Sequence, residues 1–258
     1  MLTNKQILEI ALKQSALDYN CETDDFLKKE NTVTISKDSG KQRVYLKLPL
    51  ACSMVTYGNS IVAQTSEQLK DIVTDYISCY PPEHCFETPH LHVLDQALSK
   101  HGQKICFMAE YFLPDTDKIS VLKCAYNTKI LHQRDFKNLY TDEWSNALCE
   151  KRKHLDMLAV GAYDGDKLIG LAGASADCDT MWQIGIDVLP EYRRQGIASS
   201  LTSQLTFEIL KLGKVPFYCA AWCNVKSVKN AIKCGYTPAW VEVSAKSTDF
   251  VNEMNKTR

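Results

Sequence analysis

Two arginines and a glycine stand close together in residues 186–198, and their types suit the binding of phosphate. Gly196 lies where a predicted helix begins, and the first backbone N–H groups of a helix have no helical partner. Together with the helix dipole, these donors form a site for anions. Arg193 and Arg194 add guanidinium groups that bind phosphate oxygens. The segment therefore predicts a site for a phosphate-bearing ligand.

The residues around this turn predict a strand before it and a helix after it. Apolar side chains alternate through residues 181–188, as a half-buried strand requires. Gly213 suits the C-terminal cap of the helix, and residues 215–222 are typical of a second strand. One helix face is apolar and consists of Ile197, Leu201, Leu205, Ile209 and Leu212. The pattern predicts a βαβ unit with parallel strands, although an ordinary turn with solvated arginines shares its local features.

Two short motifs follow one another in the second half of the chain. Residues 193–198 read Arg-Arg-Gln-Gly-Ile-Ala, and residues 224–227 read Asn-Val-Lys-Ser, with Gly235 and Tyr236 further on. The first motif has neither the P-loop pattern nor the three glycines of a dinucleotide fold. It resembles the signature (Q/R)-x-x-G-x-(G/A) of the GNAT superfamily of acyl-CoA-dependent N-acyltransferases, and the second resembles that family's next motif. The resemblance covers roughly residues 124–246.

The resemblance implies an acyl-CoA site between two strands that splay apart. The pantetheine arm of the coenzyme is expected to pair with the main chain of Ile186, Asp187 and Val188. Asn224 and Ser227 are expected to reach the pantetheine or a phosphate, although Asn224 also suits the N-cap of the next helix. The pyrophosphate is expected on the residues of the turn, namely Arg193, Arg194, Gln195, Gly196, Ile197, Ala198 and Ser199.

The implied reaction is direct attack by an amine on the thioester of acetyl-CoA, or of another short acyl-CoA, in a ternary complex. Catalysis must deprotonate the ammonium, stabilise an oxyanion and protonate the thiolate. A backbone N–H near Val188 is expected to serve the oxyanion. Many family members carry a tyrosine, which acts as the acid, at the position of Ala231. Asp187 and Tyr218 are therefore the candidate catalytic residues, although strand alternation turns Asp187 away from its neighbours.

Two other functions stay open at this point. The absence of the usual acid at Ala231 also fits a non-catalytic protein that binds or senses acyl-CoA. Alternatively, the first half of the chain binds a partner and the enzyme acts on a protein. A small amine is the favoured acceptor, because the net charge of −1 gives no support for a strongly charged polymer.

The second half of the chain predicts an α/β fold with a mixed sheet. A first strand is expected at residues 126–132 and helices within 135–151. A hairpin is expected around the turn at residues 164–166, and a closing strand at 238–245. The predicted organisation is an N-terminal α/β domain at residues 1–117, a GNAT domain at 118–246 and a polar tail at 247–258.

The first half predicts a smaller α/β part without a catalytic constellation. Thr3 and Gln6 are spaced as a capping box for a helix over residues 4–17, which is unlike a signal peptide. Hairpin-like strands are expected around the turns at residues 38–40 and 57–59, before an amphipathic helix near residues 69–77. This part is interpreted as a possible degenerate GNAT-like half. The whole chain resembles a little-characterised group of bacterial two-part GNAT proteins.

Composition indicates a cytoplasmic protein that binds neither nucleic acid nor membranes. The 258 residues are 45% hydrophobic, and no apolar run reaches the roughly 18 residues that span a bilayer. The 11 cysteines are scattered, which favours a reducing compartment over a disulfide framework. A zinc site is one interpretation of His84, Cys85, His90 and His92, but the spacing matches no common zinc module. Loop packing is the preferred interpretation, and no metal is expected.

Overall fold

The structure, a computed structural model, describes residues 2–256 and has the mixed α/β class that the sequence predicts. These residues form two compact units. The first consists of residues 2–11 and 111–238, and the second of residues 12–110 and 239–256. Three elements contribute residues to both units: α1 (Asn4–Tyr19), β4 (Gln103–Pro114) and β10 (Tyr236–Ser247).

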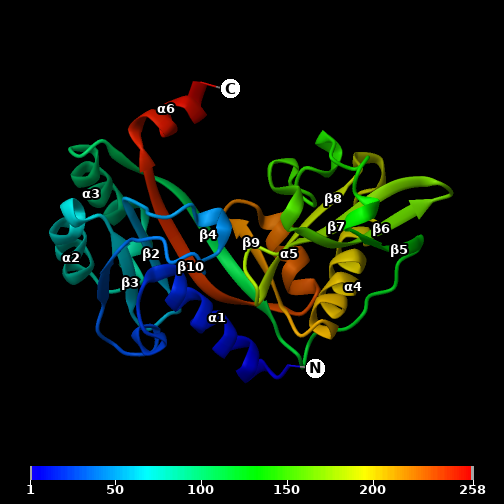
Figure 1. Ribbon diagram of the computed structural model, residues 1–258, viewed down its shortest axis with the longest axis horizontal. Coiled ribbons are helices and arrows are strands. Elements are labelled where there is room, and N and C mark those ends of the chain that lie inside the picture. The colour runs from blue at the N-terminus through cyan, green and yellow to red at the C-terminus, as the bar shows by residue number, and fades with distance from the viewer. Residues whose placement is uncertain (1, 257–258) are drawn as a thin grey trace. The chain divides into compact units, whose positions relative to one another are not determined.

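The first unit is built on a twisted sheet with the strand order β9-β8-β7-β6-β5 (Figure 1). Its strands are β5 (Asn127–His132), β6 (Asp156–Asp164), β7 (Lys167–Ser175), β8 (Met181–Val188) and β9 (Val215–Ala221). Neighbouring strands run antiparallel except β8 and β9, which run parallel. The predicted hairpin around residues 164–166 and the predicted parallel pair are both confirmed.

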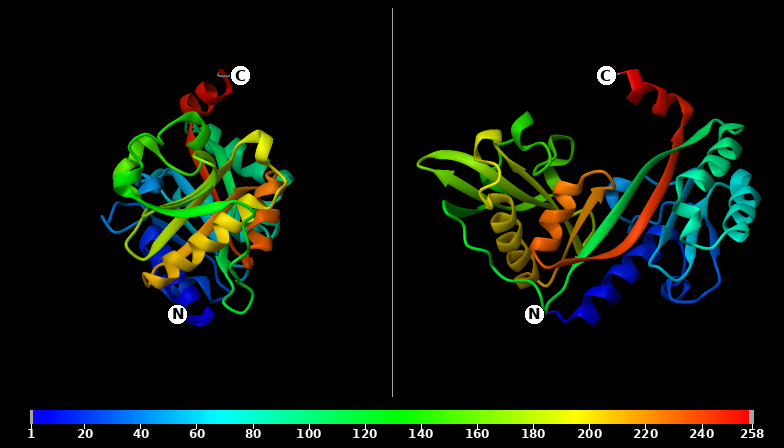
Figure 2. Two further views of the ribbon diagram at one scale, coloured as in Figure 1. Left: turned by 90° about the vertical axis from the view of Figure 1, so that its right-hand side faces the viewer. Right: turned by 180° about the vertical axis from the view of Figure 1, so that it is seen from behind.

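Two helices cover one face of this sheet, α4 (Ile197–Lys211) and α5 (Val225–Lys233) (Figure 2). The apolar face of α4 supplies Ile197, Leu201, Leu205 and Ile209 to the core, each at most 2% exposed. This burial is the reason for the helical spacing of apolar residues in the sequence. Leu212, also predicted for this face, lies at the C-cap of α4 and is 55% exposed, so that part of the prediction is wrong. The predicted helix beginning after Gly196 and the predicted cap at Gly213, whose φ is 71°, are confirmed.

The opposite face of the sheet is covered by residues 133–155, where the structure has short 3-10 turns and no α-helix. The helices predicted within residues 135–151 are therefore wrong. Gly173 and Gly185 explain the difference, because a Cβ atom at either position would lie about 2 Å from a carbonyl oxygen of Asn146 or Ala147. Two glycines on adjacent strands thus let the backbone of this segment lie flat on the sheet. Carboxylates on the sheet, described below, accept its amide hydrogens in place of helical partners.

The second unit has the strand order β1-β3-β2-β10. Its strands are β1 (Thr32–Ile35), β2 (Cys52–Thr56), β3 (Ile61–Thr65) and the greater part of β10. Helices α2 (Lys70–Cys79) and α3 (Thr88–Ser99) pack on one face of this sheet through a continuous apolar core (Figure 2). The hairpin predicted at residues 57–59 is confirmed by antiparallel pairing of β2 with β3.

The second predicted turn, at residues 38–40, does not join two strands. Residues 36–50 contain one 3-10 turn and no strand. Side chains hold this segment in place of a strand ladder: the amide of Arg43 donates to Asp18 at 2.8 Å, and that of Leu50 donates to Ser36 at 2.8 Å. Arg43 is fully buried between Asp18 and Glu242, and a long-range ion pair of this kind has no local sequence signature.

Both ends of the described chain are helical. Thr3 and Gln6 form the predicted capping box of α1, with hydrogen bonds of 2.9 and 3.3 Å between each backbone amide and the other side chain. The residues after β10 form α6 (Thr248–Lys256). A helix long and apolar enough to cross a bilayer is absent from residues 2–256.

Candidate functional site

The turn between β8 and α4 exposes the start of the helix. Gly196 is the N-cap of α4 with a φ of 80°, and no side chain caps the helix. A Cβ atom at this glycine would meet no atom within 4 Å, so the space in front of the first amides is open. Unsatisfied N–H groups and the helix dipole therefore face a free volume, as an anion site requires.

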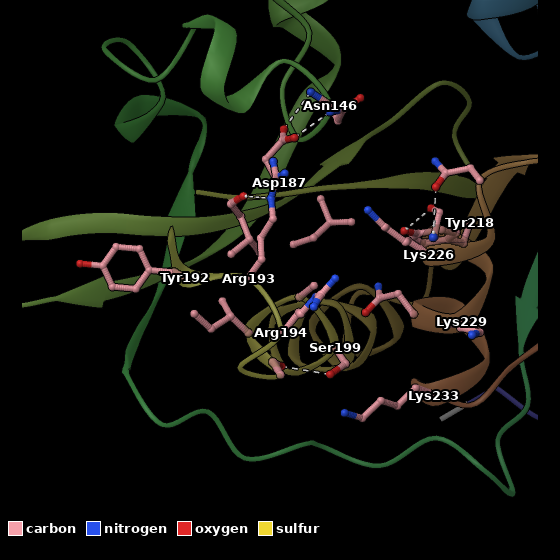
Figure 3. Close-up of a pocket in the computed structure, with 18 residues that line it drawn as sticks. Asn146, Asp187, Tyr192, Arg193, Arg194, Ser199, Tyr218, Lys226, Lys229 and Lys233 are labelled. Carbon is pink, nitrogen blue, oxygen red and sulfur yellow. Dashed lines mark hydrogen bonds between the residues drawn. The ribbon is translucent and has the colours of Figure 1, made fainter. Parts of the chain in front are cut away.

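The two arginines of the turn have different surroundings. Arg193 donates from Nε to the carbonyl oxygen of Val188 at 2.9 Å, so the end of β8 orients its guanidinium. Arg194 has a φ of 66°, a left-handed conformation that costs a non-glycine residue about 1 kcal/mol or more. Its side chain makes no ion pair with any residue in the described range. The turn thus carries exposed positive charge beside the helix N-terminus (Figure 3).

Strands β8 and β9 diverge just beyond their first residues. Among the described residues they pair at three positions, the last of which joins Gln183 to Phe217. On its other side β8 pairs with β7 without interruption up to Val188. The backbone edge of β8 from Ile184 onward is therefore open toward β9. This is the splay expected from the sequence, and it leaves main-chain groups free to bind an extended ligand.

Asp187 points to the face opposite Ile186 and Val188, as strand alternation predicts. Its carboxylate accepts hydrogen bonds from the amide of Asn146 at 2.9 Å, the side-chain amide of Asn146 at 2.7 Å and the amide of Ala147 at 2.9 Å. Figure 3 shows this contact at the upper edge of the cavity. Asp187 thus holds residues 146–147 of the covering segment against the part of β8 that does not pair with β9.

Tyr218 is the first residue of β9 after the pairing ends. The side chain is 2% exposed, and its hydroxyl lies 2.8 Å from the hydroxyl of Ser227. Burial raises the pKa of Tyr218, which keeps the phenol protonated. Asn224 is the N-cap of α5 and accepts from the amide of Ser227 at 3.2 Å, so its predicted capping role is confirmed. Ala231 is fully buried in the core.

These features border one cavity of about 670 Å³, a size typical of small-molecule sites. It brings together all but one of the residues that the sequence predicts for the site. They are Ile186, Asp187, Val188, Arg193, Arg194, Gly196, Ile197, Ala198, Ser199, Tyr218, Asn224 and Ser227. The exception is Gln195, whose side chain instead accepts a hydrogen bond from Tyr126 at 2.8 Å.

Six further residues, which are not predicted from the sequence, also line the cavity. They are Asn146, Tyr192, Lys226, Lys229, Asn230 and Lys233. Asn146 comes from the segment whose path depends on Gly173 and Gly185, so no local pattern marks it. The three lysines recur at helical spacing after Asn224, so the sequence alone could have predicted that they share one face of a helix.

A separate cluster in the second unit contains part of the predicted metal group. Nδ1 of His84 lies 2.9 Å from a carboxylate oxygen of Glu87, and Nδ1 of His90 lies 3.7 Å from the same oxygen. Among the described residues these three offer ligand atoms within 4.8 Å of one another. Cys85 is buried, and its thiol is directed at the carbonyl oxygen of Tyr80. Neither Cys85 nor His92 belongs to this group of ligand atoms among the described residues.

The family model described as GNAT acetyltransferase matches residues 55–239, more than half of the chain. The match includes residues of both compact units and begins well before the two sequence motifs. No curated protein matches the chain.

Several solved structures are distantly similar to the chain. An acetyltransferase of the GNAT family from Colwellia psychrerythraea is 19% identical, with 62% of this chain and 63% of that one covered and a TM-score of 0.44. A GCN5-related N-acetyltransferase-like protein from Streptococcus suis 89/1591 is 18% identical, with 73% of this chain and 72% of that one covered and a TM-score of 0.45. A Salmonella typhimurium protein solved with its cofactor acetyl-CoA is 15% identical, with 49% of this chain and 95% of that one covered and a TM-score of 0.35. The chain spans less than two thirds of the Colwellia protein.

Proposed function

The chain belongs to the GNAT acetyltransferase family, and on this premise we propose that it is an N-acyltransferase. It transfers an acetyl or other short acyl group from acyl-CoA to a small amine within a ternary complex. The amine nitrogen attacks the thioester carbon, the C–N bond forms and the C–S bond breaks. The ammonium loses a proton, and the departing thiolate gains one.

One observation carries this proposal: the cavity joins the uncapped N-terminus of α4, with Arg193 and Arg194 beside it, to an open strand edge. Acyl-CoA has the matching shape, because a diphosphate at one end is linked through pantetheine amides to the thioester. The diphosphate binds the amides after Gly196 beside Arg193 and Arg194. The pantetheine arm pairs with the free edge of β8 near Ile186 and Val188, like an added strand.

Tyr218 is the proposed acid for the thiolate. Its hydroxyl borders the cavity where β8 and β9 separate, and the hydroxyl of Ser227 orients it at 2.8 Å. Because burial raises its pKa, the phenol is protonated at neutral pH and has a proton to give. This role compensates for the alanine at position 231, where many family members have their tyrosine.

Asp187 is better supported as a positioning residue than as the general base. Both of its carboxylate oxygens accept hydrogen bonds from Asn146, and one of them also accepts from Ala147. These contacts fix one wall of the cavity. We further propose a reducing, cytoplasmic location, which is supported by the 11 cysteines that all have free thiols in the structure.

The test is turnover of acetyl-CoA with a panel of small amines. Turnover is monitored by the decrease in the absorbance of the thioester. Thiol reagents are unsuitable because exposed cysteines of the protein, Cys79 and Cys223, would react with them. We expect amine-dependent consumption of acetyl-CoA and formation of the acetylated amine, detected by mass spectrometry. Tight binding of acetyl-CoA without turnover of any amine would instead assign the chain to coenzyme binding or sensing.

A further inference from the structure

Helix α5 directs three lysines at the cavity. Lys226, Lys229 and Lys233 are separated by three and four residues, so they lie on one face of the helix, and all three line the cavity. Figure 3 shows them along the wall opposite the arginine turn. Their side chains come from a different element than Arg193 and Arg194, which line the same cavity.

The positive charge of this wall is uncompensated within the described chain. Five cationic side chains border the cavity against one carboxylate, that of Asp187, which is already hydrogen-bonded to Asn146 and Ala147. The lysines of the wall make no ion pair among residues 2–256. Elsewhere in the first unit lysines pair with nearby acids, as Lys167 does with Glu191 at 2.9 Å and Lys211 with Glu208 at 2.7 Å. Unpaired cations facing one cavity point to a ligand with several negative charges.

The coenzyme diphosphate accounts for part of this charge. It belongs at the N-terminus of α4, where Arg193 and Arg194 stand. The lysine wall on α5 remains, and coenzyme A carries one further strongly anionic group, the phosphate on the 3′ oxygen of its ribose. A phosphate monoester of charge near −2 is well matched to several ammonium groups, which bind it as point charges.

We propose that Lys226, Lys229 and Lys233 form a subsite for the ribose 3′-phosphate of the acyl donor. The subsite makes the protein selective for acyl-CoA over donors that lack this group, including acyl phosphopantetheine carried on a protein. This inference rests on the proposed function, because it assumes that the diphosphate lies at the turn.

The experiment is calorimetric titration with CoA and with 3′-dephospho-CoA. We expect the wild type to bind dephospho-CoA about 30-fold more weakly, at about threefold for each exposed lysine–phosphate contact. Replacing all three lysines by Met keeps their aliphatic stems and removes their charge. We expect this variant to bind both ligands with the affinity that the wild type has for dephospho-CoA. Lys137→Met is the matched control, because Lys137 is exposed and lies outside the cavity.

The outcomes separate this inference from the proposed function. If the wild type binds neither ligand, the proposed function fails. If it binds both ligands equally, or if the triple variant still discriminates between them, the coenzyme site stands and the phosphate subsite is overturned. An equal loss of affinity for both ligands in the triple variant would also overturn it. So would a change confined to the KM of the amine, which would assign the lysines to an acidic acceptor.

Discussion

Arg43 in the second unit and Arg194 in the first are arginines in opposite surroundings. Arg43 is fully buried, and it pairs with Asp18 and, at 2.8 Å, with Glu242. Arg194 is exposed at a strained position of the turn and has no ion pair with any described residue. The first charge is satisfied by the chain itself and holds its unit together. The second has no counter-charge within the described chain, and the proposed function assigns it to the coenzyme diphosphate.

The contrast extends beyond these two residues. Around Arg43 the rings of Tyr45 and Trp240 each lie 5.5 Å from the guanidinium, so aromatic side chains pack against the buried cation. Around Arg194 the side chains border an open cavity that is rich in positive charge. Residue type alone therefore does not distinguish a structural cation from a binding one. The two kinds of cation differ in whether a compensating carboxylate of the chain lies beside them.

Replacing Arg43 should have the largest effect, and the effect should be on stability. Arg43→Met leaves Asp18 and Glu242 buried without their cation, which should lower the free energy of unfolding by about 3–5 kcal/mol. Urea denaturation measures this loss. Arg134→Met is the control, because the Arg134 side chain is 84% exposed. A loss below about 1 kcal/mol would mean that the cluster is not what stabilises this unit.

The next largest effect should be on binding. Gly196→Asp places a carboxylate where the diphosphate is expected, and should weaken the affinity for acetyl-CoA at least about 1000-fold because like charges then meet. Gly213→Asp is a matched control at the other end of α4, since both glycines have positive φ and open space around their Cβ positions. Calorimetric titration should show near-normal affinity for the control. Equal losses in the two variants would indicate backbone strain rather than charge.

Loss of one hydroxyl should separate catalysis from packing. Tyr218→Phe should lower kcat about 100-fold while leaving the affinity for acetyl-CoA unchanged, because it removes only the proton donor. Tyr236→Phe is the matched control, since Tyr236 is fully buried in the same core and its hydroxyl bonds Thr206 at 2.7 Å. Equal kcat in the wild type and Tyr218→Phe would exclude Tyr218 as the acid.

The smallest effect should come from a buried carboxyl group in the first unit. Asp156 is 1% exposed, and burial raises its pKa to about 6 although the amide of Cys149 donates to it. The folded state therefore holds a proton that the unfolded state releases near pH 4. Stability should fall by about 1–2 kcal/mol as the pH rises from 4 to 6. Asp156→Asn should flatten thermal stability over this range, and an unchanged slope would refute the assignment to this group.

The elements next to the turn were predictable because their information is local. The strand at residues 181–188 and the apolar face of α4 each follow from spacing within one element, and the structure has both elements. The path of residues 133–155 was not predictable, because it depends on Gly173 and Gly185, which lie later in the chain. The role of Arg43 depends on Glu242, 199 residues away.

The candidate site shows the same division. The uncapped helix start at Gly196 and the N-cap role of Asn224 follow from short motifs and elementary helix chemistry. The contact of Asp187 with Asn146 and that of Tyr218 with Ser227 arise only once separate elements come together. These tertiary contacts change the interpretation of Asp187, from a candidate base to a residue that positions a wall of the cavity.

The proposed function requires the turn after β8 to bind the diphosphate of an acyl-CoA. Its most direct test is calorimetric titration of the intact protein with acetyl-CoA and with acetyl-pantetheine, which shares the thioester but lacks every phosphate. We predict tight binding of acetyl-CoA and a loss of at least about 100-fold for acetyl-pantetheine, as expected for charge-assisted bonds to phosphate. Equal affinity for the two compounds, or no binding of acetyl-CoA, would contradict the claim.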